Sequence, residues 1–344
     1  MPSFQRIQEN IPLAPRTTFG VGGRARWFAE ASSEAEVAEA CAWADARHLP
    51  LFVLGGGSNL LVADAGFGGL VVRIALEGIT RDGDRLRAAA GEPWERCVTL
   101  ATEAGLAGIE CLAGIPGSVG GTPVQNVGAY GQEVGAVIAR VRAFDRAAQE
   151  FVELTNEECA FAYRRSRFNS ADRGRFVVTR VEYRLHPGGA PALDYADLQN
   201  HFAGRASAPS LVEVAEAVRA IRRAKGMLFV EGEPDCRSAG SFFKNPAVAP
   251  EIAERIRVLA GSVRAYPAGG GLVKIPAAWL IEEAGFARGF ALGAAAISSR
   301  HTLALVNRGG ATASEILALA EKIRSAVEAR FGISLEMEPE RVGF

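Results

Sequence analysis

The sequence predicts an α+β protein, in which sheets and helices both line the cores. Three segments with helical periodicity begin at Ser or Thr followed three residues later by Glu, which is the pattern of a capping box. Between residues 137 and 185, apolar and polar residues alternate as they do in half-buried strands. The chain has 344 residues, 49% of them hydrophobic and 22% charged, which is enough for at least two cores of ordinary size.

In the N-terminal half, a helix is expected from Ser33, which forms a capping box with Glu36. Residues 49–64, LPLFVLGGGSNLLVAD, predict a strand, a glycine-rich turn and a second strand. A second helix is predicted from Pro93, since proline is favoured in the first helical turn. The next segment, residues 108–133, is too rich in Gly and Pro to form one regular element.

In the C-terminal half, the alternation over residues 137–185 predicts strands, and the composition of 186–210 is typical of a boundary. A helix that begins at Ser210 marks the expected start of a second domain. The last long helix begins at Thr312. Residues 333–338 then alternate again and predict a terminal strand with two carboxylates on one face.

Charge and cysteine content exclude several classes of protein. Lys and Arg total 38 and Asp and Glu 39, so the net charge of −1 gives no general attraction to nucleic acid or anionic lipid. The five cysteines show no CxxC or Cys/His spacing, which predicts reduced thiols and no metal site. No signal-peptide pattern and no run of about 18 apolar residues occurs, so we expect a cytoplasmic protein without a membrane segment.

Two glycine-rich segments are candidates for ligand binding. Residues 55–61, GGGSNLL, present unobstructed backbone N–H groups beside the side chains of Ser58 and Asn59, which suits a pyrophosphate. The segment is neither a Walker A loop nor a GxGxxG fingerprint, and a plain hairpin turn is the alternative. Residues 115–131 interleave glycines with apolar and polar side chains, which favours contact with a flat, polar-edged cofactor over a surface loop.

Two further segments carry polar chemistry. In residues 161–168, FAYRRSRF, an extended backbone would send Arg164 and Arg165 to opposite faces, so one of them can meet an anionic partner. The residues alone favour a solvated basic strand. In residues 237–246, RSAGSFFKNP, Ser241 is a candidate nucleophile, proton donor or turn hydroxyl. GxSxG is absent and the four histidines have no triad setting, so support for hydrolase chemistry is weak.

Taken together, the segments resemble the family of UDP-N-acetylenolpyruvoylglucosamine reductases, the flavoenzymes called MurB, in the longer form that carries a tyrosine loop. Nearly the whole chain takes part, because the family's motifs occur in the family's order: TTFGVGG, LGGGSNLLVAD, GLAGIECLAGIPGSVGGTPVQNVGAYGQEV, FAYRRSRF, RSAGSFFKNP, KIPAAWLIEEAGF and LEMEPERVG. The resemblance implies an FAD-binding region of the vanillyl-alcohol-oxidase type, followed by an α/β substrate-binding domain. The expected ranges are 1–205 for the FAD region, in subdomains of about 1–75 and 76–205, then 206–332 for the substrate domain and 333–344 for a strand that returns toward the flavin.

The resemblance also implies an activity. FAD is expected to bind noncovalently, and NADPH to reduce it at a site that both ligands use in turn. The reduced flavin would pass a hydride from N5 to C3 of the enolpyruvyl group of UDP-N-acetylglucosamine enolpyruvate. Protonation at C2 would then give UDP-N-acetylmuramate, a peptidoglycan precursor. We expect a monomer whose only partners are these small molecules.

Individual roles follow from the same resemblance. Arg164 and Glu338 stand at catalytic positions, where they would stabilise the negative charge that hydride transfer pushes onto C2 and its carboxylate. Ser241 matches the serine that protonates C2. Neighbouring Lys244 or Asn245, or a water, is our candidate for feeding the proton relay. The expected FAD contacts are Gly55, Gly56, Gly57, Ser58, Asn59, Ile115, Pro116, Gly117 and Ser118. The expected substrate contacts are Tyr195, Lys225, Asn245 and Glu283, the last at a position where some members carry glutamine.

Two other functions stay open. The first is an FAD-dependent oxidase or dehydrogenase of another small molecule, which keeps the flavin and changes the chemistry. The second is a non-catalytic nucleotide-sugar binding protein with a regulatory role. The coexistence of Arg164, Ser241 and Glu338 argues against this second alternative, since binding alone needs no proton donor.

Overall fold

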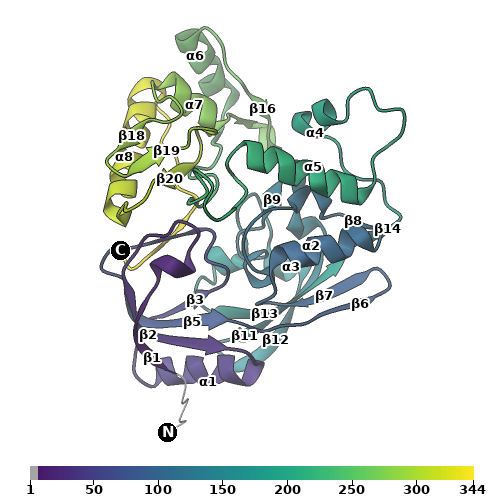
Figure 1. Cartoon of the computed structure of the whole chain (residues 1–344), viewed down its shortest axis with the longest axis vertical. Helices are drawn as coiled ribbons and strands as arrows, with labels where there is room; N and C mark the ends of the chain where they lie inside the picture. The colour runs from purple at the N-terminus through teal and green to yellow at the C-terminus, as the bar shows by residue number, and fades with distance from the viewer. Residues whose placement is uncertain (1–6) are drawn as a thin grey trace. The chain divides into compact units, whose positions relative to one another are not determined.

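The computed structural model describes residues 7–344, and the chain divides into two compact units (Figure 1). The first unit contains the described residues up to Pro12 together with Arg24–Gly57 and Phe67–Ala224. The second contains Leu13–Gly23, Ser58–Gly66 and Lys225–Phe344. Both units are therefore assembled from separate stretches of sequence, and each is described here on its own.

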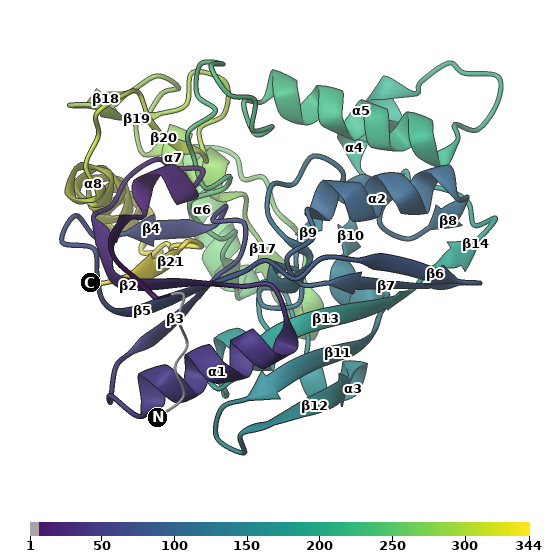
Figure 2. The ribbon, with the colours of Figure 1, turned by 60° about the horizontal axis from the view of Figure 1, so that its bottom comes forward.

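A four-stranded sheet forms one part of the first unit, in the order β1, β2, β5, β3. The pairs β2–β5 and β3–β5 are parallel, and β1 is antiparallel to β2. The bounds are β1 Gln8–Pro12, β2 Arg24–Ala31, β3 Leu51–Leu54 and β5 Phe67–Ile74. Helix α1 (Glu34–Asp45) packs on β2 and β5 (Figure 2). As predicted, the Ser33 hydroxyl accepts a hydrogen bond from the Glu36 amide at 3.2 Å. The Glu36 carboxylate, however, accepts the amide of Ser32 instead of that of Ser33, so only half of the expected capping box forms.

A five-stranded antiparallel sheet forms the other part, in the order β12, β11, β13, β7, β6. Its bounds are β6 Ile79–Asp82, β7 Arg85–Ala89, β11 Ile138–Asp145, β12 Glu150–Thr155 and β13 Phe176–Arg184. The strands predicted over residues 137–185 are therefore confirmed. Helix α2 (Trp94–Glu103), predicted from Pro93, buries Trp94 against Tyr183 of β13 with ring centroids 5.7 Å apart.

Helix α5 (Leu211–Ala224) begins at the predicted cap Ser210, but it belongs to the first unit. Its residues Val214, Ala215 and Val218 are buried in the core of that unit, and it packs against α2. The compact units thus divide between residues 224 and 225, and they do not coincide with the predicted ranges 1–205, 206–332 and 333–344. The reason is the apolar face of α5, which packs against the core of the first unit.

Short elements complete the first unit. Strand β8 (Leu106–Ala107) pairs with β14 (His186–Pro187), and β9 (Gly128–Ala129) pairs with β10 (Gln132–Glu133). The remaining helices are α3 Asn156–Cys159 and α4 Ala196–His201, with the 3₁₀ turns η2 Glu110–Leu112, η3 Val119–Gly121, η4 Val134–Ala136 and η5 Arg167–Asn169.

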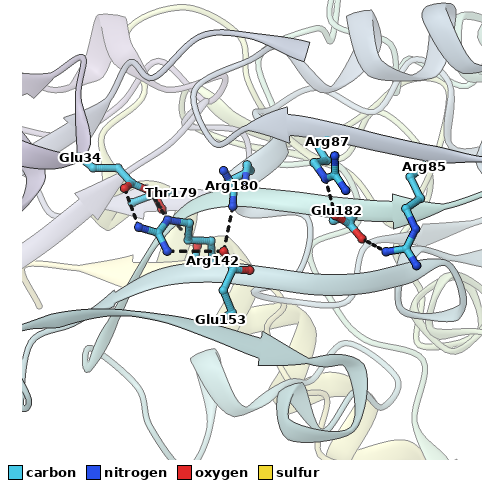
Figure 3. A network of polar contacts seen from close by, with 8 residues as sticks. All are labelled: Glu34, Arg85, Arg87, Arg142, Glu153, Thr179, Arg180 and Glu182. Carbon is cyan, nitrogen blue, oxygen red and sulfur yellow. Dashed lines mark hydrogen bonds and ion pairs between the residues drawn. The ribbon is translucent and has the colours of Figure 1, made fainter. Parts of the chain in front are cut away.

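A polar network links the two sheets of the first unit (Figure 3). Arg142 on β11 donates two hydrogen bonds, of 2.7 and 2.9 Å, to the carboxylate of Glu34, the first residue of α1. Thr179 on β13 donates to the same carboxylate at 2.8 Å. Because Glu34 begins the helix that packs on the four-stranded sheet, these bonds fix that helix against the five-stranded sheet.

In the same network, Glu182 on β13 accepts hydrogen bonds from Arg85 and Arg87 on β7. Burial raises the pKa of Glu182, but the hydrogen bonds from Arg87 and Arg85 outweigh that effect and leave the pKa below its ordinary value of 4.5. A carboxyl whose pKa is lower in the folded state stabilises the fold above its unfolded pKa. That stabilisation is lost as the pH falls through the folded pKa.

We therefore expect Glu182→Gln to lower the free energy of unfolding by about 1–3 kcal/mol at neutral pH, since hydrogen bonds to a charged group are lost. The difference from the unmodified protein should shrink as the pH falls below 4.5. Urea unfolding at several pH values measures this difference. Glu150→Gln, at an exposed position on β12, is the control and should change little. An unfolding difference that is the same at every pH would contradict the assignment.

The second unit contains three small sheets. Strand β4 (Leu60–Val62) pairs in parallel with β21 (Glu340–Val342) (Figure 2). The other two sheets have the orders β15–β17–β16 and β18–β19–β20. Their bounds are β15 Ala247–Val248, β16 Tyr266–Pro267, β17 Val273–Lys274, β18 Ala291–Leu292, β19 Ala295–Ile297 and β20 Leu305–Asn307. The unit also holds the 3₁₀ turns η1 Ala14–Arg16 and η6 Gly269–Gly271.

The terminal strand of this unit differs in position from the strand that the sequence predicts. Residues 333–336 alternate in burial as predicted, whereas Met337 and Glu338 are both half-buried. Within this segment only Met337 forms a bridge, and the terminal strand is β21. The predicted strand is thus displaced toward the C-terminus, because the partner that completes a ladder, β4, lies beside Glu340–Val342.

Three helices belong to this unit, α6 (Pro250–Ala260), α7 (Ala277–Glu283) and α8 (Ala313–Phe331). Helix α8 packs on β18, β19 and β20, and α7 packs on α8. The capping box predicted at Thr312 forms with Glu315, and the Asp64 carboxylate adds hydrogen bonds to the amides of Ala313 and Ser314. The predicted start of α8 is therefore confirmed. Within residues 7–344, no helix is long and apolar enough to cross a membrane.

All five cysteines lie among the described residues, where they are buried with free thiols. Burial raises the pKa of Cys41, Cys97, Cys111 and Cys159 to about 12. Since the thiolate is the reactive form, these four side chains are unreactive at neutral pH and serve to fill the core.

Candidate functional site

In the first unit, the two predicted glycine-rich segments touch each other through their backbones. A Cβ atom added to Gly56 would lie 2.5 Å from the Cα of Gly117 and 2.9 Å from the amide of Ser118. One added to Gly55 would lie 2.6 Å from the Ser118 hydroxyl. Only glycine allows an approach this close. The structure therefore brings together segments that lie about 60 residues apart in the sequence. Where they meet, the backbone is not covered by side chains.

This glycine cradle, formed by Gly55–Gly57 and residues 115–118, also contains an unused hydroxyl. The Ser118 side chain is 7% exposed, and no residue of the described chain makes a hydrogen bond with its Oγ. Buried hydroxyls are nearly always satisfied, so this one indicates a ligand atom as its partner. The hairpin alternative for residues 55–61 is wrong, because β3 and β4 before and after the turn pair in different sheets.

Arg164 lies at the tip of a tight turn in the first unit. The backbones of Ala162 and Arg165 exchange two hydrogen bonds, of 2.9 and 3.0 Å, so Tyr163 and Arg164 form the turn. Arg164 has a φ of +54°, a left-handed conformation that costs a non-glycine residue about 1–3 kcal/mol. The prediction of a solvated basic strand is wrong here, because the chain reverses direction. Arg165 is exposed and Arg164 is half-buried, so one of the two does face inward.

A small hairpin receives the Arg164 side chain. Its Nη2 donates to the carbonyl of Gly128 on β9 at 2.7 Å. Asn126, 2% exposed, connects the same parts: its Nδ2 donates to the carbonyl of Ala162 at 3.0 Å and its Oδ1 accepts the Gly135 amide at 2.8 Å. The second glycine-rich segment and the candidate catalytic arginine are thereby fixed against each other.

One tyrosine forms the turn of this β9–β10 hairpin, and a second tyrosine packs against the first. Tyr130 forms the β9–β10 turn with Gly131, both at positive φ, and its ring meets that of Tyr195 edge to face with centroids 5.2 Å apart. Burial raises the pKa of Tyr130 to about 12, so its hydroxyl stays protonated at neutral pH. Tyr195 directly precedes α4 and is 44% exposed.

In the second unit, the C-terminal segment lies beside Ser58 and Asn59. The amide of Glu340 donates to the carbonyl of Asn59 at 2.9 Å, and Asn59 Nδ2 donates to the carbonyl of Glu338 at 3.3 Å. Thr18 Oγ1 donates to the carbonyl of Ser238 at 2.6 Å and lies 3.3 Å from that of Ser58. The TTFGVGG motif, the end of the first glycine-rich segment and the C-terminal residues therefore meet in one unit.

Ser241 and Glu338, both predicted to be catalytic, are also brought together in the second unit. Phe243 and Met337 form an antiparallel bridge, and the Glu338 amide donates to the carbonyl of Phe242 at 2.9 Å. Ser241 is the residue before Phe242, so its backbone is a neighbour of Glu338. Both side chains are half-buried. Within the described chain, no residue makes a hydrogen bond with the Ser241 hydroxyl.

The other predicted residues of this unit have structural partners. Lys244 Nζ lies 2.5 Å from the Glu336 carboxylate, so it holds this pair of segments together. Asn245 Oδ1 accepts the Ala277 amide at 2.9 Å and thereby caps α7. Glu283, at the end of α7, lies 3.4 Å from Arg330 on α8. Lys225 lies half-buried in the turn after α5, at the start of the last stretch of the unit, Lys225–Phe344.

Sequence reasoning missed two residues that shape the site, Tyr130 and Thr18, and indicated Asn126 only as one of the polar side chains of residues 115–131. Asn126 and Tyr130 have φ values of +46° and +48°. The Tyr130–Gly131 pair precedes a polar residue at a chain reversal, and a glycine at the second turn position is the one signal that predicts such a hairpin. For Thr18, the partners are 40 and 220 residues away, and no local pattern indicates them.

Two family models match the chain and agree with this geometry. Residues 25–155 match the FAD binding domain, and residues 233–342 match the C-terminal domain of UDP-N-acetylenolpyruvoylglucosamine reductase. The bare backbone of the glycine cradle and the buried Ser118 hydroxyl fit the phosphate-rich cofactor that the first match implies. The protein is a flavoprotein, an FAD-dependent oxidoreductase whose FAD-binding domain is of the vanillyl-alcohol-oxidase type.

Full-length relatives narrow this class. The enzyme named UDP-N-acetylenolpyruvoylglucosamine reductase in Streptomyces coelicolor is 47% identical over 353 residues, covering 99% of this chain and 92% of the relative. The one from Mycobacterium marinum is 44% identical and covers 98% and 96%. The crystal structure of MurB from Thermus caldophilus matches with a TM-score of 0.70 and 29% identity, over 98% of this chain and 100% of the other. The chain belongs to the UDP-N-acetylenolpyruvoylglucosamine reductase family, whose members act in peptidoglycan precursor synthesis.

Proposed function

We propose that this protein reduces the enolpyruvyl group of UDP-N-acetylglucosamine enolpyruvate to give UDP-N-acetylmuramate, with NADPH as the source of the hydride. The observation that carries the proposal is that the backbones of Ser241 and Glu338 are neighbours, since the Glu338 amide donates to the carbonyl of Phe242, the residue after Ser241. This brings a residue with a hydroxyl and a residue with a carboxyl group to the same place in the second unit. A site that only bound the nucleotide would need neither. In the overall reaction the carbon–carbon double bond gains a hydride at C3 and a proton at C2, and NADPH becomes NADP⁺.

The cofactor and its protein contacts have separate tasks. Bound FAD supplies the hydride chemistry, because it can accept a hydride from NADPH and deliver one to the substrate. Gly55–Gly57 and residues 115–118 would hold it through backbone N–H groups and the Ser118 hydroxyl, and Ser58 and Asn59 continue the same segment. These are the FAD contacts that the family resemblance predicts, and they remain a proposal for this chain.

Ser241 is the proposed proton donor to C2. A serine hydroxyl is a weak acid, but a carbanion next to a carboxylate is a strong enough base to take its proton. A positioned acid of this kind contributes about 10²–10⁴-fold in rate. Asn245 and Lys244 are poorer candidates for relaying the replacement proton, because one caps α7 and the other pairs with Glu336. We infer that a water molecule returns a proton to the Ser241 side chain after it has protonated C2.

Arg164 and Glu338 are proposed to stabilise the charge that develops as C3 receives the hydride. A guanidinium has five N–H donors, so Arg164 can hold the Gly128 carbonyl and donate to a substrate carboxylate at once. Its turn fixes the direction of the side chain before any ligand binds, which is what preorganised charge stabilisation requires. Glu338 would complete the site as a hydrogen-bond partner of the enolate-like state.

Tyr195, Lys225, Asn245 and Glu283 are the proposed contacts to the rest of the substrate. The exposed ring of Tyr195 is suited to close on a nucleotide, and the ammonium of Lys225 to meet a phosphate or carboxylate. Asn245 would use its amide N–H groups, since its carbonyl oxygen is engaged by α7. We also expect the enzyme to be a monomer, which light scattering of the holoenzyme tests.

The absorption spectrum of the purified protein tests this function first. We expect a flavin spectrum that bleaches when NADPH is added without oxygen and recovers when the enolpyruvyl nucleotide follows. UDP-N-acetylglucosamine, which lacks the double bond, is the matched control and should leave the flavin reduced. Recovery only with oxygen, and indifference to the enolpyruvyl nucleotide, would favour an oxidase of another small molecule. A colourless protein that takes up no FAD would leave a nucleotide-sugar binding role.

A further inference from the structure

A fully buried carboxylate in the first unit has no part in the mechanism above. Glu110, in η2, is 0% exposed. Its Oε1 accepts hydrogen bonds from Gln132 Nε2 at 2.8 Å and from the Ala192 amide at 2.9 Å, and its Oε2 accepts the Gly108 amide at 2.7 Å. A carboxylate this deep is retained only where its hydrogen bonds hold something in place, because burying a charge is costly.

One of the three bonds fixes the chain that leads to Tyr195. The Ala192 amide donates to Glu110, and the Ala192 carbonyl accepts the thiol of Cys111 at 3.3 Å. Both backbone groups of Ala192 are thus held by two consecutive residues of η2. On the other side of Tyr195, Leu198 is 0% exposed and anchors α4 in the core. Tyr195 lies midway between these two fixed points.

The second bond fixes the partner of Tyr195. Gln132 is on β10, two residues after Tyr130, and its Oε1 also accepts the Cys111 amide at 2.8 Å. The β9–β10 hairpin, which carries Tyr130 and receives Arg164, is therefore tied to η2 by the same carboxylate that holds Ala192. The two tyrosine rings, 5.2 Å apart, come from the two segments that Glu110 joins.

We propose that Glu110 is a positioning residue, which sets the place of Tyr195 over the substrate through Ala192 and the place of Tyr130 through Gln132. This inference rests on the proposed function, in which Tyr195 contacts the nucleotide. With Ala192 held, a chain of three residues limits the travel of Tyr195 to roughly 10 Å. Glu110 thereby fixes one end of the short segment that carries Tyr195.

Glu110→Gln tests the proposal in the holoenzyme. One carboxylate oxygen becomes an NH₂ group, which donates hydrogen bonds and cannot accept them. This group must face either the Gly108 amide or the donors of Ala192 and Gln132, so two donors oppose each other in either orientation. We expect KM for the enolpyruvyl nucleotide to rise about tenfold, which corresponds to the loss of one buried hydrogen bond. The rise in KM should exceed any fall in kcat, and the flavin absorption spectrum should change little, because FAD and Ser241 are untouched.

Asp145→Asn is the matched control. Asp145 is 3% exposed and accepts the amides of Ala147 and Ala148, but it pairs with Arg175 at the far end of β11. It should lower the unfolding midpoint as Glu110→Gln does and leave KM unchanged. If both substitutions raise KM equally, the effect is one of general stability and the proposal fails.

A double-mutant cycle with Tyr195→Ala separates positioning from a merely structural role. If Glu110 acts through Tyr195, Glu110→Gln will raise KM in the unmodified protein and have no further effect once the ring is gone. Equal effects in both backgrounds would overturn the proposal. If Glu110→Gln does not fold, Ala192→Pro replaces it in the cycle, because proline lacks the N–H group that donates to Glu110. It too should raise KM in the unmodified protein and have no further effect in Tyr195→Ala.

Amide hydrogen exchange tests the anchor without any turnover. Over residues 188–198, exchange should be about tenfold faster in Glu110→Gln than in Asp145→Asn, since one protecting hydrogen bond is lost. Equal exchange would show that Glu110 does not hold this segment. If the unmodified holoenzyme fails to consume the enolpyruvyl nucleotide, the proposed function is wrong, and the exchange rates alone then decide whether Ala192 is anchored.

Discussion

Replacing Ser241 by alanine is expected to slow protonation of C2 by about 10²–10⁴-fold, the contribution of a positioned proton donor. Reduction of the flavin by NADPH should be nearly unchanged, since that half-reaction needs no proton from Ser241. Fold and cofactor binding should survive too, because Ser241 is half-buried and no described residue depends on its hydroxyl. The result would be an enzyme that bleaches normally with NADPH and recovers slowly with the enolpyruvyl nucleotide.

Stopped-flow absorbance of the two half-reactions measures this separation. Ser334→Ala is the matched control, because Ser334 is an exposed serine in the same unit, four residues before Glu338. It should react like the unmodified enzyme in both steps. Equal slowing of both half-reactions by Ser241→Ala would indicate damage to folding or to FAD binding, and the assignment of Ser241 as the proton donor would then be wrong.

Replacing Gly56 by alanine is expected to have the largest effect on the cofactor. The added methyl group would lie 2.5 Å from the Gly117 Cα and 2.7 Å from its carbonyl carbon, and backbone atoms cannot rotate away as a side chain can. Overpacking of this kind costs about 1–3 kcal/mol. Part of this cost should appear as a lower unfolding midpoint, and the remainder as weaker binding of FAD, up to about 100-fold.

The ratio of flavin to protein absorbance after purification, together with thermal unfolding, measures both parts. Gly68→Ala is the control: Gly68 is an exposed glycine on β5, and a Cβ atom there would have no neighbour within 4 Å. It should retain its flavin. Full flavin content and an unchanged midpoint in Gly56→Ala would contradict the role of the two glycine-rich segments as a cradle.

Local patterns predicted the local elements well. The caps at Ser33, Ser210 and Thr312 stand where the sequence indicates, because a cap depends on residues only three positions apart. The strands on both sides of the first glycine-rich segment are confirmed for the same reason. Each of these signals is complete within one short window of sequence.

The arrangement of the site lay beyond such patterns. Asn59 and Glu338 are 279 positions apart, and their contact depends on the pairing of β4 with β21. The turn at Arg164 needs a positive φ at a residue type that seldom adopts one, so an extended strand was the natural prediction. Asn245 caps a helix that begins 32 residues later, after a proline that has no capping side chain of its own. Pairings over such separations are set by packing rather than by neighbouring residues.

The pairing of β4 with β21 has a consequence for how the protein is made. On the ribosome, Ser58–Gly66 emerges early, but its partner strand is synthesised only after Met337. The second unit therefore cannot finish folding until Glu340–Val342 has been synthesised, and Leu60–Val62 must wait as an unpaired, apolar edge. Nascent chains of this protein should depend on chaperones that shield such edges until the partner strand has emerged.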